Sequence, residues 1–408
     1  MPGNSAQGRP VHNERTVSTY CYQCVAGPDL LKVRIEDGIA TEIGPNFDAA
    51  TIHPAGGKVC VKAFGLVQKA YTPNRVLTPM KRTNPKKGRN EDPGFVPISW
   101  DEALDLVAEK LKTARAAGLI DEAGYPRVAA SFGGGGTPTA YMGTLPAFLG
   151  AWGPVDMSFG SGQGVKCTHS EHLYGELWHR AFTVAPDTPL CEYVISFGAN
   201  VEASGGVCGV KRHADARNRG MKRVQVEPHL SVTGGASAEW IPIKPKTDVA
   251  FLFAMIHVLL HEHPRERLDV PFLKNVTSSP YLIGPNGYFL RDAATRRPLM
   301  FDLRSGRAVA FDTKGVDPAL EGTFRVDGIE VGPDSEVTAH HGVEARPAFA
   351  HLVDHVKSYS PEWASWICDV PAATIRRVTN EFLDHAHVGE TIEIEGVTLP
   401  YRPVSISF

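Results

Sequence analysis

The sequence lacks a strong charge of either sign. Its 408 residues include 42 Lys and Arg against 45 Asp and Glu, for a formal net charge of -3. That balance gives no electrostatic reason to bind nucleic acid or an anionic membrane surface. The sequence also lacks an apolar run of membrane-spanning length, because the best window, Val249 to Leu260, is too short and contains His257. Neither a nucleic-acid partner nor a membrane span is predicted.

Cysteine is sparse, and its number, seven, is odd. A disulfide-stabilised secreted scaffold would have more thiols in a shorter chain, so a reducing compartment is predicted. The segment from Met1 to Arg15 has no apolar stretch and no Arg-Arg pair, so it does not look like a secretory or twin-arginine signal. We therefore predict a cytoplasmic protein, long enough for two to four domains.

Three of the cysteines surround a predicted hairpin. Cys21 and Cys24 are three positions apart, and Cys60 follows downstream. Between them, residues 30–43 alternate in hydrophobicity on either side of Asp37-Gly38, a strong hairpin signal. Thiols on the loops around a hairpin can converge on one inorganic centre, which predicts an iron–sulfur site. The Cys-x2-Cys spacing alone would also suit zinc or buried structural thiols.

The middle of the chain alternates between strand-like and helical segments. Ser99 can cap a helix, with Glu102 completing a capping box and Gly118 ending the helix. Further segments are strands at 128–132, 190–197, 223–227 and 238–243, and helices at 142–149, 210–219, 248–261, 347–356 and 372–385. This alternation predicts α/β domains with a parallel sheet, in which ligands bind beyond the carboxyl ends of the strands.

An ordered set of motifs resembles the molybdopterin oxidoreductase family of the DMSO-reductase type. The motifs are Cys21 to Cys24, the hairpin, Cys60 to Lys62, Pro73 to Arg82, Ile98 to Ala103, Phe197 to Asn200, Val226 to Pro228, Pro245 to Asp248 and Tyr359 to Ala373. Within the family, the segment Cys21 to Asp29 resembles phenylacetyl-CoA:acceptor oxidoreductase large subunits. The resemblance implies a bis(molybdopterin guanine dinucleotide) centre of molybdenum or tungsten, connected to an iron–sulfur cluster.

The resemblance also implies a set of cluster ligands. Cys21, Cys24 and Cys60 match cluster cysteines of the family. The usual remaining cysteine would fall at Pro28, which cannot bind a metal, whereas the neighbouring Asp29 can offer an oxygen ligand. The implied cluster is 4Fe-4S or, with one ligand missing, 3Fe-4S, and an oxygen ligand would change its potential.

The resemblance places the protein ligand of molybdenum or tungsten upstream of Phe197. Cys167 lies in that interval, and a thiolate suits such a metal, although a buried free cysteine is the alternative. Ser158 and Ser170 are the second-choice ligands. The nearby histidines are candidates for proton transfer, with a structural role as the alternative for each; they are His169, His172 and His179.

The positions implied around the pterin dinucleotide follow the predicted strands. Lys62 matches the family lysine between cluster and pterin, and the others are Gly198, Asn200, Glu202, Glu227 and Asp248. Glycine lets a backbone approach a pyrophosphate, and carboxylates accept hydrogen bonds from ribose hydroxyls and the guanine amino edge. Simple turn chemistry after a strand is the alternative reading. Cys191, Cys208 and Cys368 are interpreted as structural thiols.

The predicted organisation combines both lines of reasoning. It comprises a disordered tail (1–17), an iron–sulfur cluster module (18–82), an α/β domain contributing to the metal site (83–185), a dinucleotide-binding α/β domain (186–265), an insertion (266–345), and closing helices followed by a truncated next portion (346–408). A strand pair around Glu395-Gly396 belongs to the last segment. The C-terminal barrel of the family is absent, which suggests a fragment or half of a split subunit.

The implied function is catalysis of a redox reaction on a small molecule, with phenylacetyl-CoA oxidation to phenylglyoxylate as the substrate suggested by the closest resemblance. The implied partners are an iron–sulfur electron-transfer subunit and a membrane anchor subunit. Three alternatives remain open at this point: a cluster-bearing accessory module without catalysis, a non-redox hydratase or transhydroxylase on the same scaffold, and a zinc- or thiol-stabilised binding protein.

Overall fold

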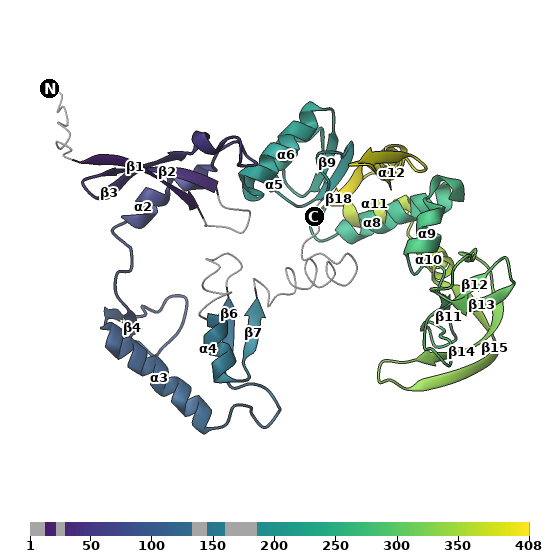
Figure 1. The fold of residues 1–408 in the computed structure, drawn as a ribbon, viewed down its shortest axis with the longest axis horizontal. Helices are drawn as coiled ribbons and strands as arrows, with labels where there is room; N and C mark the ends of the chain where they lie inside the picture. The colour runs from purple at the N-terminus through teal and green to yellow at the C-terminus, as the bar shows by residue number, and fades with distance from the viewer. Residues whose placement is uncertain (1–12, 22–28, 133–144, 160–185, 408) are drawn as a thin grey trace. The chain divides into compact units, whose positions relative to one another are not determined.

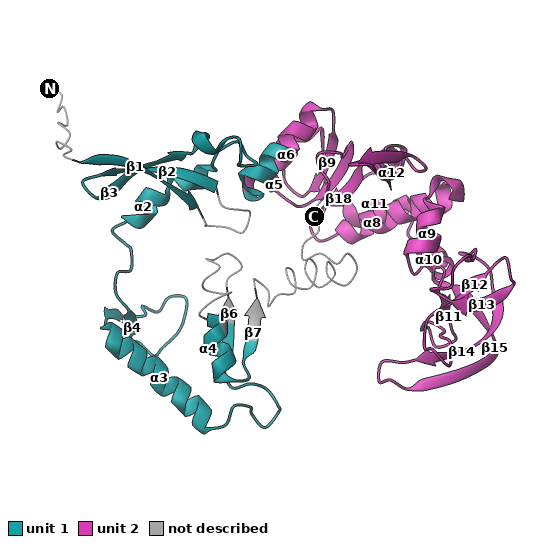
Figure 2. Ribbon diagram, viewed as in Figure 1, with its two compact units in different colours: residues 1–185, 204–212 teal, residues 186–203, 213–408 magenta. Residues whose placement is uncertain are grey.

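The computed structural model describes residues 13–21, 29–132, 145–159 and 186–407. The chain divides into two compact units (Figure 2). Unit 1 comprises residues 1–185 and 204–212, and unit 2 comprises residues 186–203 and 213–408. Within the described ranges, no helix is both long and apolar enough to cross a lipid bilayer.

Unit 1 begins with a three-stranded antiparallel sheet of β1 (Glu14–Cys21), β2 (Asp29–Glu36) and β3 (Ile39–Pro45). The predicted hairpin is confirmed, because Asp37 and Gly38 both have positive φ in the turn between β2 and β3. The prediction of a disordered tail up to residue 17 needs correction, since residues 14–17 of β1 pair with residues 33–36 of β2. Alternation could not reveal β1, which is mostly exposed.

The rest of unit 1 consists of short elements and one long helix. They are η1 (Phe47–Ala49), α1 (Val61–Phe64), α2 (Leu66–Ala70), the antiparallel pair β4 (Met80–Arg82) and β5 (Phe95–Pro97), α3 (Trp100–Ala116), α4 (Leu145–Trp152), and the parallel pair β6 (Ala129–Phe132) and β7 (Asp156–Phe159). Ser99 caps α3 as predicted, because its Oγ accepts a 3.1 Å hydrogen bond from the Glu102 amide. Gly118, with φ of +96°, follows the end of the helix.

Unit 2 is built on a parallel sheet in the order β10-β9-β8-β18. Its strands are β8 (Tyr193–Phe197), β9 (Lys222–Glu227), β10 (Glu239–Pro242) and β18 (Val404–Ser407). Every residue of β8 is buried, as predicted for a central strand. Residues 404–407 form β18, an edge strand of this sheet that pairs with β8, a pairing that the sequence did not predict (β18 in Figure 1).

Helices complete the core of unit 2. The short helix α5 (Val201–Ser204) follows β8, and α6 (Gly206–Asn218) leads from α5 to β9. Another short helix, α7 (Val232–Ala236), lies between β9 and β10 in the chain. Helix α8 (Asp248–His257) continues as a π-helical turn, η5 (Val258–Glu262), and packs against α11 (Pro361–Cys368) and α12 (Ala372–Asp384). The core joins the apolar faces of β8, β9 and β10 to these three helices.

The predicted insertion has strands and a core of its own inside unit 2. It contains β11 (Leu282–Ile283), the pair β12 (Leu299–Asp302) and β13 (Arg307–Ala310), and the long hairpin β14 (Phe324–Val331) and β15 (Val337–Pro347). Around it lie η6 (Arg265–Arg267), α9 (Val270–Val276) and α10 (Ala348–Val356). The strand pair predicted around Glu395-Gly396 is confirmed as β16 (Thr391–Ile394) and β17 (Val397–Pro400).

Glu381 joins α12 to the sheet and should give unit 2 a measurable acid sensitivity. Its carboxylate accepts hydrogen bonds from Lys222 Nζ (2.7 Å), Tyr193 Oη (2.8 Å) and Arg377 Nη1 (3.0 Å). Burial alone would raise the pKa of Glu381, but these donors lower it to about 2 from 4.5. The stabilisation is therefore complete above about pH 4.5 and is lost as the pH falls towards 2.

Glu381→Gln is expected to lower the free energy of unfolding at pH 7 by about 2 kcal/mol and to flatten its decline below pH 4.5. Urea unfolding measured from pH 7 to pH 3 checks this. Glu362→Gln is the matched control. The pKa of Glu362 is also lowered to about 2, chiefly by Arg376, but its side chain is 61% exposed, so its loss should cost less than about 1 kcal/mol. Equal losses for both variants would contradict the prediction.

Candidate functional site

Three predicted cluster ligands converge at one end of the small antiparallel sheet. Cys21 ends β1 and lies opposite Asp29, the first residue of β2. The backbone amide of Cys60 donates a 3.1 Å hydrogen bond to Asp29 Oδ2. Cys60 also precedes α1 directly as its N-cap residue. Cys21 lies eight positions before Asp29 and Cys60 lies 31 positions after it, and the fold brings these segments together. Cys24 lies outside the described residues.

The donor set at this end of the sheet suits an iron–sulfur cluster. Cys21 and Asp29 are both buried, each with 8% of its surface exposed, and Cys60 is half-buried. In the described parts of the chain, no three His, Cys, Asp or Glu side chains meet at a point where one metal ion could bind. A four-iron cluster binds its protein ligands at different irons, so its ligands need not meet at one point.

A tight loop between β3 and α1 sets the position of Cys60. Gly57 has φ of +73°, and a Cβ there would lie 2.3 Å from the carbonyl oxygen of Asn46. Gly57→Ala is expected to lower the free energy of unfolding by about 3 kcal/mol, because it adds this clash to left-handed backbone strain. Gly56→Ala is the control, because φ there is +64° and the atom nearest to the added Cβ, Lys58 Nζ, lies at 3.4 Å. Backbone strain alone should lower the free energy of unfolding of this variant by about 1 kcal/mol. Urea unfolding of both variants tests the difference.

A fourth thiol, Cys208, also belongs to this region. It lies near the start of α6, in the segment 204–212 that groups with unit 1. Burial and the charge of Asp29 raise the pKa of the Cys208 thiol, and a hydrogen bond from the Ala55 backbone amide opposes that rise. The sequence predicted a structural role for Cys208, because nothing in its local spacing connects it to Cys21 or Cys60.

The other two cysteines interpreted as structural lie in unit 2. Cys191 is 8% exposed, in a small apolar cluster with Val194, Ala216 and Met221. Cys368 is fully buried at the end of α11. Their surroundings are apolar, and burial raises the pKa of the Cys368 thiol.

The carboxyl edge of the parallel sheet collects the predicted dinucleotide positions. Gly198 follows β8 directly with φ of +65°, and its amide donates to the carbonyl of Val226 in β9. Asn200 follows two residues later, and Glu227 ends β9. Because β8, β9 and β10 run parallel, these residues lie at the same edge. Asp248 starts α8 in the connection that follows β10.

Hydrogen bonds hold the loop after β8 in a defined position. Asn200 Oδ1 accepts from the amide and the hydroxyl of Thr233, at 3.3 Å and 3.0 Å. Glu202 binds Arg223 Nη2 through one oxygen and the Thr233 hydroxyl through the other, both at 2.5 Å. Burial opposes ionisation of Glu202, but these donors outweigh it and lower the pKa. Glu202 therefore shapes the edge of the sheet through Arg223.

The Glu227 carboxylate also accepts hydrogen bonds from the protein itself. Its carboxylate accepts from the Ser231 amide at 2.7 Å and from Gln225 Nε2 at 3.0 Å, and it is only 2% exposed. Gln225 Nε2 also donates to the carbonyl of Ala199, whereas Gln225 Oε1 is buried and has no hydrogen-bond partner among the described residues. A buried acceptor at the carboxyl edge of a parallel sheet fits a ligand that carries a donor group.

The remaining predicted residues divide into two groups. Lys62 is exposed in α1, two positions after Cys60. Cys167, His169, His172, His179 and Ser170 lie outside the described residues, and of Ser158 only the backbone, in β7, is described. Their roles at the molybdenum or tungsten ligand position stay predictions.

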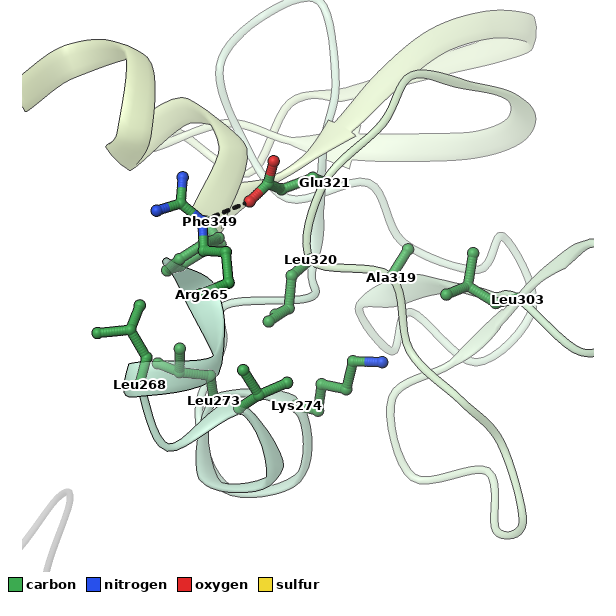
Figure 3. Close-up of a pocket in the computed structure, with 10 residues that line it drawn as sticks. Arg265, Leu268, Leu273, Lys274, Leu303, Ala319, Leu320, Glu321 and Phe349 are labelled. Carbon is green, nitrogen blue, oxygen red and sulfur yellow. Dashed lines mark hydrogen bonds and ion pairs between the residues drawn. The ribbon is translucent and has the colours of Figure 1, made fainter. Parts of the chain in front are cut away.

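Unit 2 also contains a cavity of about 290 Å³ beside the insertion (Figure 3). Its lining is mostly apolar and includes Leu268, Leu320 and Phe349. The charged pair at its wall, Arg265 and Glu321, is joined by a 2.7 Å hydrogen bond. Binding sites combine an apolar lining with polar groups that face the ligand. In this cavity the two charged side chains bond each other instead. The cavity therefore adds no functional prediction.

Comparison with known proteins gives consistent results. Residues 75–267 match the family model described as molybdopterin oxidoreductase. The chain is 26% identical to a sulfite dehydrogenase subunit of Allochromatium vinosum over 89% of this chain and 36% of that protein. It is 28% identical to a putative dimethyl sulfoxide reductase catalytic subunit of Halobacterium salinarum over 89% of this chain and 42% of that protein.

Two further similarities agree with this. The molybdopterin-containing subunit of arsenate respiratory reductase from a Shewanella species is 30% identical over 60% of this chain and 27% of its own length. The solved structure of acetylene hydratase from Pelobacter acetylenicus superposes with a TM-score of 0.56 and 18% identity, covering 96% of this chain and 40% of that chain. At that identity the likeness shows the fold alone. The chain spans about a quarter to two fifths of the length of these relatives.

Proposed function

We propose that the chain is a member of the molybdopterin oxidoreductase family, and that it is part of the catalytic subunit of a molybdenum or tungsten enzyme that exchanges electrons through an iron–sulfur cluster. The family match over residues 75–267, with similarity to catalytic relatives across 89% of the chain, carries this proposal. The convergence of Cys21, Asp29 and Cys60 supports the cluster.

In this proposal unit 1 holds the cluster. Cys21, Cys24 and Cys60 bind iron through their thiolates, and the Asp29–Cys60 hydrogen bond fixes the backbone at Cys60. Lys62, exposed two residues further on, stabilises the added negative charge when the cluster is reduced. When bound, the molybdenum or tungsten centre supplies the redox step on the substrate, and the cluster conducts the electrons.

Unit 2 binds one pterin dinucleotide at the carboxyl edge of its sheet. Gly198 lets the backbone approach the pyrophosphate, and Asn200, Glu227 and Asp248 surround the nucleoside. Cys167 is the proposed protein ligand of the metal, with His169 and His172 as proton carriers nearby. Glu202 positions the loop through its hydrogen bond with Arg223.

The proposed reaction is oxidation of phenylacetyl-CoA towards phenylglyoxylate. Water supplies the ketone oxygen and hydrolyses the thioester, so that the CoA thiol leaves, the electrons pass to the cluster and the protons pass to the solvent. It rests on the Cys21 to Asp29 motif alone, because the named relatives act on compounds as different as sulfite, arsenate and dimethyl sulfoxide. Those relatives are named as subunits of larger enzymes, so an iron–sulfur electron-transfer subunit and a membrane anchor subunit are the proposed partners.

Cofactor analysis of the native assembly, isolated without oxygen, tests the proposal. We expect molybdenum or tungsten, iron, and a fluorescent pterin with guanine nucleotide after denaturation. Iron without pterin would instead identify an accessory electron-transfer module, and zinc without iron would identify a thiol-stabilised binding protein. Turnover that needs no electron acceptor would point to a hydratase or transhydroxylase on the same scaffold.

A further inference from the structure

The loop between α12 and β16 is bonded to two other segments of unit 2. Arg402, which follows β17, donates from Nη1 to the backbone carbonyls of His387 at 3.0 Å and Glu390 at 3.1 Å. The amide of Glu192, directly before β8, donates to the carbonyl of Pro403 at 2.7 Å. The two ends of the β16–β17 hairpin therefore meet beside the segment that leads into β8.

His387 lies in this loop with a left-handed backbone, at φ of +48°. Its Nδ1 lies 3.0 Å from Glu390 Oε1, and its Nε2 lies 3.0 Å from Glu192 Oε2. Ionised carboxylates only accept hydrogen bonds, so both ring nitrogens must donate, and only the protonated imidazolium has two N–H groups. The geometry therefore selects the charged histidine as the form that joins the loop to the start of β8.

Several other polar groups face this cluster. The Tyr401 ring lies over the His387 imidazole with the centroids 5.4 Å apart, and Tyr401 Oη donates to Glu192 Oε1 at 2.9 Å. His385, after the end of α12, acts on Glu192 electrostatically. A polar cavity of about 230 Å³ beside His387 and Glu390 adds three charged side chains; they are Glu266, and Arg267 and Asp384, which pair with each other at 2.7 Å. A neutral His387 would leave one of its two carboxylates without an imidazole donor.

The β16–β17 hairpin has little else to hold it. It forms a two-stranded sheet of its own, and every residue of β17 is exposed. Two-stranded hairpins are at best marginally stable by themselves. Ile392 and Leu399 of the hairpin line a cavity of about 240 Å³ together with Leu190 and Cys191. Release of the hairpin would therefore open this cavity to water.

The hydrogen bonds to Glu390 and Glu192 raise the pKa of His387 above 6.5, and burial opposes this rise only in part. Because the folded pKa is raised, the contact is complete below about pH 6.5 and is lost as the pH rises through the raised value. The side chains of His387, Glu192 and Glu390 are 28%, 41% and 63% exposed, and ion pairs this exposed add little to global stability. The effect is therefore expected in local opening of the hairpin.

We propose that His387 is a pH-sensitive latch, which holds the β16–β17 hairpin against the segment before β8 when protonated and, when neutral, releases the hairpin and opens the cavity beside Cys191. The inference does not depend on the proposed function, because none of these residues is a proposed cofactor ligand. Arg402 bonds Asp269 at 2.6 Å and stays charged throughout, so the ends of the hairpin keep their place and the release stays local.

Amide hydrogen exchange of the full-length chain from about pH 5.5 to about pH 9, corrected for the intrinsic rate at each pH, tests the latch. The amides of β16 and β17 are expected to lose protection as the pH rises, whereas those of β8 and β9 keep theirs. By linkage, opening becomes about tenfold more frequent for each pH unit that separates the pKa of His387 in the latched and released states. The pKa read from the imidazole NMR signals should reproduce that factor, and a mismatch would overturn the proposal.

Three variants make the outcomes decisive. His387→Asn tolerates the left-handed backbone but removes the cation, so its hairpin should be released at every pH. Glu192→Gln keeps an acceptor for Tyr401 and should move the release to lower pH, because one of the two carboxylates that favour the imidazolium is gone. His341→Asn, at a histidine with a side chain 89% exposed, should keep the wild-type response. Protection that does not change with pH in the wild-type chain, or that changes equally in His387→Asn, would refute the latch.

Discussion

Replacing Arg223 with methionine is expected to lower the free energy of unfolding of unit 2 by about 3–5 kcal/mol. Arg223 is 1% exposed in β9, and its guanidinium contacts Glu202 (2.5 Å), His213 Nδ1 (2.6 Å) and Ser237 Oγ (2.9 Å). Removing it leaves the Glu202 carboxylate, whose side chain is 10% exposed, with only the Thr233 hydroxyl as a partner among these contacts. An unpaired buried charge is far more costly than the loss of packing.

A double-mutant cycle separates the charge from the packing. Glu202→Gln combined with Arg223→Met should be more stable than Arg223→Met alone, because the carboxylate that lost its partner is no longer present. Arg376→Met is the surface control. Arg376 bonds Glu262 and Glu362 with a side chain 34% exposed, so its loss should cost about 1 kcal/mol or less. Urea unfolding gives all these values, and equal losses at Arg223 and Arg376 would contradict the expectation.

The sequence predicted those features that depend on neighbours in the chain. The Asp37-Gly38 hairpin and the Ser99 cap both appear as expected, because turn and capping geometry depend on a few consecutive residues. The parallel order of β8, β9 and β10 also follows from local alternation, since short crossovers through helices leave few other topologies.

Features that depend on contacts between residues far apart in the sequence were not predicted. The apolar residues of α3 fall at helical spacing, yet no residue of α3 is buried in the described structure. Periodicity identifies an apolar face but not the surface that covers it. Strand β18 pairs with β8 across more than 200 positions of the chain, which no local pattern can show.

The candidate site shows the same limit at single residues. The family resemblance implied Glu202 and Glu227 as dinucleotide-binding residues. The structure adds that both carboxylates accept hydrogen bonds from donors of the protein itself. Only the burial of Arg223 and Gln225 reveals this. Cys208 was interpreted as structural because its connection to the cluster module passes through Ala55, more than 150 residues earlier in the chain.

Replacing Cys21 and Cys60 together with alanine is expected to remove the proposed iron–sulfur cluster completely. Both thiols lie at the end of the antiparallel sheet where Asp29 connects β2 to the loop before α1. The one thiol that remains of the proposed set, Cys24, cannot hold the irons of a cluster that four ligands normally bind. Iron should fall to background, visible absorbance should disappear, and electron transfer from substrate to an acceptor dye should fall on the order of 100-fold or more.

Folding must be separated from metal binding in this experiment. Cys21 contributes to the apolar core of the module beside Leu31, Val33 and Ile43, and alanine keeps that position apolar, so the far-UV circular dichroism should change little. Alanine at both Cys191 and Cys368 is the matched control, since it removes two thiols that are buried in unit 2. That variant should lose stability but keep all its iron. If it lost iron while the Cys21 and Cys60 variant retained it, the assignment of the cluster to unit 1 would be wrong.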